Sequence, residues 1–288
     1  MPALGTVSLA APELHRQITC HQGPGHRNGA SGSYQEGMDS LVLRSPAGRL
    51  DQSPAYTLRL AADADEITAA QRLRWNVFTG EFGAILRSPV PGLDIDAFDE
   101  FCDHLVVVDE RDGQVVATYR LLRPGRCDVR YADSEFDLRS LDGLAGQLVE
   151  TGRSCVHPDH RAGAAINLLW AGMARYMHLY NMRYLGGCAS VDLADGGHAA
   201  ASVRALAAGK HPAPESLRVT PRRPWPGLET FQPRPTPALL KGYLRLGAWI
   251  CGEPSYDPDF NCADFYVLLD VTRVDARYMR HFLGADHG

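Results

Sequence analysis

QLVETGRSCVHPDHRAGAAINLLW, residues 147–170, is the stretch of sequence that decides the fold. Its first part, 147–156, has the pattern of a strand, and the apolar residues from Ile166 onward recur at helical spacing. A strand that turns into a helix leaves the first N–H groups of the helix unpaired, and the helix dipole favours an anion there. Gly163, Ala164 and Ala165 keep this backbone open, so a phosphate could bind against it. A tight strand-to-helix connection without a ligand explains the same residues about equally well.

Regular patterns extend on both sides of this stretch. The upstream pattern predicts a strand from Tyr56, a helix of about twenty residues between Asp63 or Asp65 and Gly83, strands at 104–110 and 114–122, and a short helix around 134–144. The downstream pattern predicts a helix from Ile166 to Tyr180, a strand at 183–190, helices at 198–209 and 238–250, a strand at 264–271 and a helix at 275–283. Strands interleaved with helices in this order predict an α/β fold with a mixed central sheet flanked by helices.

Two segments break this regularity. Residues 1–55 are rich in Gly, Ser and Pro and have no sustained period, so we interpret them as a mostly disordered tail ahead of one domain, 56–288. Residues 211–237 hold eight prolines and are expected to form an irregular loop or lid.

The composition is that of an ordinary globular protein, with 45% hydrophobic and 22% charged residues. A net charge of −5 argues against a protein that binds nucleic acid by neutralising phosphates. The seven cysteines are scattered without a CxxC pair, which is typical of reduced thiols in the cytoplasm. Neither a signal peptide nor a stretch able to span a bilayer is evident, so we expect a cytoplasmic protein.

Glu150 and Arg153 lie on the predicted strand at 147–156. A buried carboxylate can act as a general base toward an ammonium acceptor, and a nearby arginine can orient it or keep it ionised. Strict alternation places the two side chains on opposite faces, but Gly152 favours a bulge that resets the alternation. A salt bridge on an edge strand is the competing interpretation, and the pair alone favours it about two to one.

An acidic run, DIDAFDEFCDH at 94–104, follows the first predicted helix. Its carboxylates could bind a cationic substrate, whereas the spacing lacks the glycine and terminal glutamate of a calcium loop. A solvated acidic loop is the default for such a run. Arg74 and Phe78 share a face of the first helix, and Arg120 ends an apolar strand; each arginine alone is compatible with a surface charge.

Two other patterns are assigned no chemistry. His157 and His160 lie in a turn without a third ligand nearby, so no metal site is predicted. Cys155 has no identifiable base as a partner and is interpreted as a buried small hydrophobe.

Together these motifs resemble those of the GCN5-related N-acyltransferases. The turn HPDHRAGAA resembles their phosphate-binding loop, Gln/Arg-x-x-Gly-x-Gly/Ala, although His160 occupies the first position here. Within that superfamily, RLRWNVF, DIDAFD, TYRLL and ETGR follow the order and approximate spacing of acyl-homoserine-lactone synthases. The tryptophan that those synthases carry after the first helix is absent from EFGA at 81–84, which argues against a lactone-forming enzyme.

The sequence is more similar to the ornithine lipid N-acyltransferases, also called hemolysin-like. FDEFCDHLVV, GRSCVHPDHR, LLKGYLRLGAWICGEPSYDPDFNCADF and RYMRHFL carry the resemblance, which covers about 57–284. It implies the GCN5-related fold with a C-terminal extension and no permanently bound cofactor. It also implies transfer of a 3-hydroxyacyl chain from the phosphopantetheine arm of acyl carrier protein to the α-amine of ornithine, which gives lyso-ornithine lipid.

The resemblance also implies roles for residues. Glu150 is the expected catalytic base with Arg153 beside it, and Asp96 or Asp99 could pair with the δ-ammonium of ornithine. The expected acceptor site comprises Arg74, Phe78, Asp96, Asp99 and Arg120. The expected donor site comprises the backbone near Cys155 and Val156, for the oxyanion, and the turn with His160, Arg161, Gly163, Ala164 and Ala165, for the phosphate.

Partners follow from the same reaction. Carrier protein is acidic, so the arginines of the proline-rich segment are candidates for docking it, although a solvated loop also explains them: Arg218, Arg222, Arg223 and Arg234. A lysolipid product implies peripheral contact with the inner face of the membrane. The alternatives are another N-acyl amino acid or amine synthase, with acyl-CoA as donor, a non-catalytic acyl-carrier-binding module, and a protein acetyltransferase.

Overall fold

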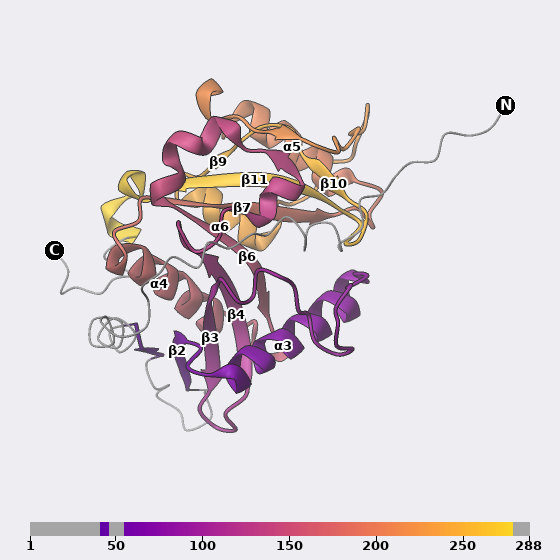
Figure 1. The fold of residues 1–288 in the computed structure, drawn as a ribbon. Helices are drawn as coiled ribbons and strands as arrows, with labels where there is room; N and C mark the ends of the chain where they lie inside the picture. The colour runs from indigo at the N-terminus through magenta and orange to yellow at the C-terminus, as the bar shows by residue number, and fades with distance from the viewer. Residues whose placement is uncertain (1–40, 46–54, 279–288) are drawn as a thin grey trace.

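The computed structural model describes residues 41–45 and 55–278. These residues form a nine-stranded mixed sheet in the order β1-β2-β3-β4-β6-β7-β11-β10, with β9 paired to β11 (Figure 1). The strands are β1 (Leu43–Arg44), β2 (Tyr56–Leu60), β3 (Asp103–Asp109), β4 (Val115–Leu122), β6 (Leu148–Val156), β7 (Tyr184–Asp192), β9 (Trp249–Ile250), β10 (Ser255–Asp257) and β11 (Cys262–Asp270). Only β6 and β7 pair in parallel within this sheet. The predicted mixed sheet is confirmed.

Helices cover both faces of the sheet: α3 (Ala64–Phe82), α4 (Ala164–Leu179), α5 (His198–Gly209) and α6 (Ala238–Arg245). α3 packs on Val106 and Val108 of β3, whereas α4 packs in the cluster that contains Leu105 and Val107. Because successive residues of a strand point to opposite faces, α3 and α4 cover opposite sides of the sheet.

The first helix begins and ends where its sequence predicts. The Asp63 side chain accepts hydrogen bonds from the N–H groups of Asp65 and Glu66, at 3.0 and 2.9 Å. Gly83 ends the helix with a φ of 62°, a conformation that glycine adopts without a steric penalty.

Short elements account for most departures from the predicted pattern. The helix expected at 134–144 is replaced by two 3₁₀ helices, η1 (Tyr131–Ser134) and η2 (Arg139–Gln147), separated by β5 (Phe136–Asp137). The helix expected at 238–250 ends at Arg245, because the chain turns at Gly247, where φ is 91°, and then enters β9. Most of the helix expected at 275–283 lies outside the described residues.

The tail expected at 1–55 falls almost entirely outside the described residues. Within it, however, Leu43 and Arg44 pair with Leu58 and Thr57 of β2, and Leu41 is fully buried. Residues 41–45 are therefore ordered, because Leu41 and Leu43 pack against the core at the edge of the sheet. The composition of the segment did not indicate this short strand.

The proline-rich segment 211–237 is irregular but packed. It contains η4 (Glu215–Leu217) and β8 (Thr220–Pro221), which pairs with β5, and the Trp225 side chain is buried. The Arg222 N–H donates to the Glu135 carbonyl oxygen at 2.7 Å. This hydrogen bond holds the segment beside residues that line the candidate site.

Candidate active site

Glu150 occupies a central position on β6, and both of its carboxylate oxygens accept backbone hydrogen bonds. Oε2 accepts from the N–H of Tyr131 at 2.7 Å, and Oε1 accepts from the N–H of Ala132 at 3.0 Å. The residue is only 6% exposed. Burial raises the pKa of Glu150 to about 7, and the two backbone hydrogen bonds oppose this rise only in part. The carboxyl group can therefore exchange a proton near neutral pH.

The bulge that Gly152 predicted is present in β6. Arg120 of β4 lies opposite Gly152 and Thr118 lies opposite Cys155, so β6 holds one residue more than β4 over this interval. Arg153 has a φ of 54°, in the left-handed region that side chains seldom adopt. As a consequence, the side chain of Arg153 lines the same cavity as that of Glu150. The edge-strand interpretation is wrong, because β6 lies between β4 and β7.

β6 and β7 part beyond Glu150. Their parallel pairing ends where Glu150 faces Gly186, although both strands continue for six more residues. A Cβ atom on Gly187 would lie 2.2 Å from the Thr151 carbonyl oxygen, so glycine permits the last close approach of the two backbones. β7 goes on pairing with β11 instead.

A small polar cavity of about 60 Å³ lies between the diverging strands. Glu150, Gly152 and Arg153 line it from β6, and Cys188 and Ser190 line it from β7. A cavity of this size admits a few water molecules or the end of a small polar substrate.

Three arginines and three aspartates form one network of ion pairs beside this cavity: Arg74, Arg120, Arg153, Asp94, Asp96 and Asp99. Arg74 is fully buried; its Nε lies 2.8 Å from Asp94 Oδ2 and its Nη2 lies 2.9 Å from Asp99 Oδ2. Arg120 Nη1 lies 2.5 Å from Asp96 Oδ1 and 3.0 Å from Asp99 Oδ1. The structure thus brings together the four charged residues that were expected around an acceptor: Arg74, Asp96, Asp99 and Arg120.

Arg153 completes the network from β6. Its Nε lies 3.2 Å from Asp94 Oδ2, and its Nη2 lies 3.4 Å from Asp96 Oδ2. Burial by itself would raise the pKa of Asp96, but the charges of Arg120 and Arg153 outweigh it and lower that pKa. The formal charges of the network cancel.

The acidic run at 94–104 is not a solvated loop. Asp94, Asp99 and Asp103 are each less than 10% exposed. Sequence reasoning missed Asp94 as a site residue, because nothing in the run indicates which carboxylate reaches two arginines from different elements. Asp96 and Asp99 are both engaged by arginines, which leaves neither without a counter-ion in the described chain.

Phe78 lies one layer behind the cavity. Its ring packs edge-on against that of Phe260, with centroids 5.6 Å apart, and Phe260 lines the cavity. The structure therefore gives Phe78 a packing contact with the wall of the cavity.

The turn between β6 and α4 presents backbone rather than side chains. Gly163 precedes the helix with a φ of 104°, and no side chain caps the N–H groups of the first turn. The His160 ring is hydrogen-bonded to the Tyr56 hydroxyl at 2.9 Å, and Arg161 Nη2 donates to Glu81 at 2.7 Å. An anion at this turn would therefore bind the N–H groups of Ala164 and Ala165, which begin α4, because the side chains of His160 and Arg161 are engaged elsewhere.

Cys155 and Val156 lie at the end of β6 that leads to this turn. Burial raises the pKa of the Cys155 thiol to about 12, which disfavours a thiolate nucleophile. The Val156 carbonyl oxygen accepts from Arg161 Nη2 at 2.9 Å, so the carbonyl is directed toward the turn.

Three carboxylates on the far side of the polar cavity were missed by the sequence analysis: Glu135, Asp257 and Asp264. They come from the loop before β5, from β10 and from β11. Their separation along the chain gave no common motif. Ligand atoms of Asp257, Cys262 and Asp264 lie within 4.8 Å of one another.

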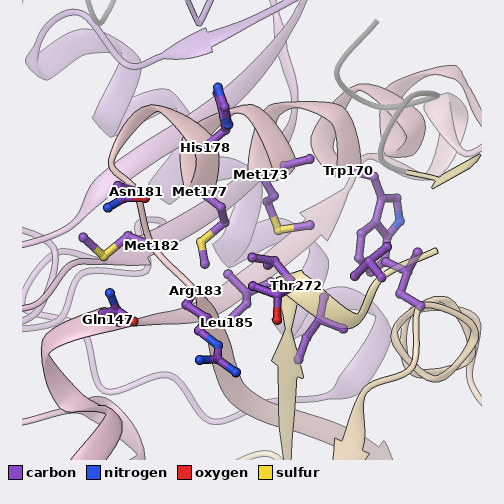
Figure 2. A pocket seen from close by; sticks show the side chains of 15 residues that line it. Gln147, Trp170, Met173, Met177, His178, Asn181, Met182, Arg183, Leu185 and Thr272 are labelled. Carbon is purple, nitrogen blue, oxygen red and sulfur yellow. The ribbon is translucent and has the colours of Figure 1, made fainter. Parts of the chain in front are cut away.

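A larger, apolar cavity of about 430 Å³ lies at the C-terminal end of α4 (Figure 2). Trp170, Met173 and Met177 of α4 face Leu185 of β7 across it. None of the predicted catalytic or acceptor residues lines this cavity.

The comparisons with known proteins agree with this architecture. Residues 73–171 match the acetyltransferase (GNAT) domain model. The chain is 39% identical over 249 residues to an L-ornithine N(alpha)-acyltransferase of Rhodobacter capsulatus, covering 79% of this chain and 95% of that protein. It is 35% identical over 249 residues to the protein of the same name from Agrobacterium fabrum, covering 78% and 84%. The solved structure of FeeM, an N-acyl amino acid synthase from uncultured soil microbes, superposes with a TM-score of 0.50 at 14% identity, covering 77% and 94%.

The match to the GNAT domain and the names of the relatives identify the chain as an N-acyltransferase. Within that class, identities above 30% over most of both chains assign the sequence to one family. The chain belongs to the L-ornithine N(alpha)-acyltransferases. Among the described residues, no helix is both long and apolar enough to cross a membrane.

Proposed function

We propose that this protein transfers a 3-hydroxyacyl chain from acyl carrier protein to the α-amine of ornithine, with Glu150 as the general base. The observation that carries the proposal is the buried Glu150 carboxylate, which is fixed by two backbone N–H groups and lines a cavity beside the parted strands. The names of relatives at 35–39% identity support ornithine as the acceptor.

The chemical step is a direct attack of the amine on the thioester carbonyl. The ornithine α-amine is largely protonated at neutral pH, so Glu150 accepts a proton, directly or through a water, and frees the nitrogen lone pair. The C–N bond forms and the C–S bond breaks. The attacking nitrogen gives its second proton to the departing thiolate, and the proton held by Glu150 is released to solvent. A positioned base of this kind typically contributes about 10²- to 10⁴-fold in rate.

The donor is proposed to lie along the outer half of β6. The single phosphate of a phosphopantetheine arm would bind the N–H groups at Gly163, Ala164 and Ala165, since no side chain caps that helix end. The arm would extend toward Glu150, and backbone N–H groups near Cys155 and Val156 would stabilise the oxyanion. No permanently bound cofactor enters this step.

The ion-pair network orients the acceptor side of the reaction. Arg120 and Arg153 line the polar cavity, where their N–H groups are proposed to donate hydrogen bonds to the α-carboxylate of an amino acid. Asp94 holds Arg153 in place through a 3.2 Å ion pair. Since the product is a lysolipid, we propose that the protein works at the inner face of the membrane without crossing it.

The test is acylation by the purified full-length chain. Ornithine, lysine, glycine and homoserine are each offered with a 3-hydroxyacyl carrier protein or the matching acyl-CoA, and the products are identified by mass spectrometry. We expect Nα-acylornithine from the carrier-protein donor as the main product. Acylation of glycine or homoserine in preference to ornithine would replace the proposed acceptor, and a clear preference for acyl-CoA would replace the donor.

A further inference from the structure

Four carboxylates line the small polar cavity without a cationic partner. Glu135, Glu150 and Asp264 are each no more than 6% exposed, and Asp257 is half-buried. None of the four lies within 4.0 Å of a basic side chain in the described part of the chain. The arginines that share the cavity are already neutralised by Asp94, Asp96 and Asp99. These buried carboxylates outnumber the free cations of the cavity. A bound cation would stabilise them, because burying an unpaired charge costs free energy.

Glu135 gives an independent indication of a ligand. Its Oε2 atom is buried and accepts no hydrogen bond among the described residues, although the side chain lines the cavity. Burial and the neighbouring Asp264 carboxylate together raise the pKa of Glu135 well above its usual value. The fold thus holds two buried carboxyl groups side by side, where Asp264 disfavours the charge of Glu135, and a bound cation would favour the charged form.

Glu135 and Asp264 stand apart from the proposed base. Glu150 pairs in register with Gly186 of β7, whereas Asp264 pairs with Ser190, four residues further along that strand. Asp264 and Glu150 therefore approach the cavity at positions four residues apart along β7. A small diamine can face both carboxylates if its two amines reach the cavity at separate points.

We propose that Glu135 and Asp264 form a subsite for the second ammonium group of the acceptor, the one that is not acylated. This inference rests on the proposed function and deepens it: in ornithine the group is the δ-ammonium, while the α-amine faces Glu150. The subsite also replaces Asp96 and Asp99 in that role, because both of those carboxylates are bound to arginines. By holding the far amine, it would direct acylation to the α-amine.

The test compares two acceptors with two isosteric variants. Norvaline has the carbon skeleton of ornithine without the δ-amine. We expect the unaltered protein to prefer ornithine over norvaline by about 100-fold or more in kcat/KM, because a site built for a polar group discriminates against its absence. Glu135→Gln and Asp264→Asn should each reduce that ratio by about 10-fold or more, mainly through the KM for ornithine.

Glu215→Gln, in the exposed η4 helix, is the matched control and should leave the ratio unchanged. The melting temperature of both cavity variants should not fall, because an amide removes a buried repulsion without changing the shape of the side chain. A loss of activity toward both acceptors in equal proportion would overturn the subsite. A loss of activity on chelation by EDTA would also overturn the subsite, because it would assign Asp257, Cys262 and Asp264 to a divalent cation.

The two proposals fail in different ways. If the unaltered protein acylates ornithine and norvaline equally well, the subsite is wrong and the proposed function stands. If it acylates neither, the proposed function itself is wrong.

Discussion

Both carboxylate oxygens of Glu150 accept hydrogen bonds from backbone N–H groups of the 3₁₀ turn that begins at Tyr131, whereas the oxygens of a surface carboxylate face water. These hydrogen bonds fix its position without supplying a counter-charge. The sequence indicated Glu150 and Arg153 as candidates through the resemblance to a known family, and the bulge predicted at Gly152 brings both side chains to one cavity. It was insufficient for Asp94, Glu135 and Asp264, whose partners are brought to them only by the folded sheet.

Asp94 supports the site by holding two arginines from different elements. Its Oδ2 atom lies 2.8 Å from Arg74 Nε and 3.2 Å from Arg153 Nε. We expect Asp94→Asn to lower the free energy of unfolding by about 3 kcal/mol, because breaking a buried ion pair leaves an uncompensated charge. Urea denaturation measures this loss. The control Asp159→Asn, at an exposed carboxylate, should change stability by less than about 0.5 kcal/mol; equal effects of the two substitutions would contradict the role of Asp94.

At the scale of elements, β6 and the start of α4 carry the donor side of the proposal. The bulge in β6, the end of its pairing with β7 and the uncapped start of α4 follow one another within 147–170. Helix α3 and this stretch were predictable, because Asp63, Gly83 and Gly163 are strong local signals. The short strands β1, β9 and β10 were not, because strands of two or three residues exist only through the long strands they pair with.

A substitution at Gly163 tests the role of the turn between β6 and α4. A Cβ atom there would meet nothing within 4 Å, but the φ of 104° is strained for any other residue. We expect Gly163→Ala to shift the first N–H groups of α4 and to raise the KM for the acyl donor about 10-fold, with little change in the KM for ornithine. Gly146→Ala is the control, since its Cβ is also unobstructed and its φ is not left-handed. An unchanged donor KM in steady-state assays would remove the turn from the donor site.

At the scale of the whole molecule, the proline-rich segment connects exposed arginines to residues that line the small polar cavity. The Arg222 N–H donates to the Glu135 carbonyl, and the Arg223 carbonyl oxygen accepts from the N–H of Tyr256 on β10. Both arginine side chains are exposed. The sequence predicted an irregular segment but not that it packs through Trp225, since burial of a single aromatic leaves no periodic pattern.

We predict that an acidic carrier protein docks on the exposed arginines of this segment. Arg222→Glu combined with Arg223→Glu should raise the KM for the acyl carrier protein at least about 10-fold at low salt and weaken its salt dependence. The KM for an acyl-CoA donor, which needs no protein docking, serves as the internal control. Unchanged kinetics with the carrier protein would place docking elsewhere.

The pH dependence of kcat/KM for ornithine tests Glu150 as the base most directly. A pKa of about 7 means that the carboxyl group is protonated, and unable to accept a proton, below neutral pH. We therefore expect kcat/KM to fall about tenfold per pH unit below pH 7. In Glu150→Gln the inflection near pH 7 should disappear, because kcat/KM then follows only the deprotonation of the ornithine amine, and the rate at pH 8 should drop about 10²- to 10⁴-fold with the fold retained. A Glu150→Gln variant that keeps both the inflection near pH 7 and the rate would contradict the mechanism.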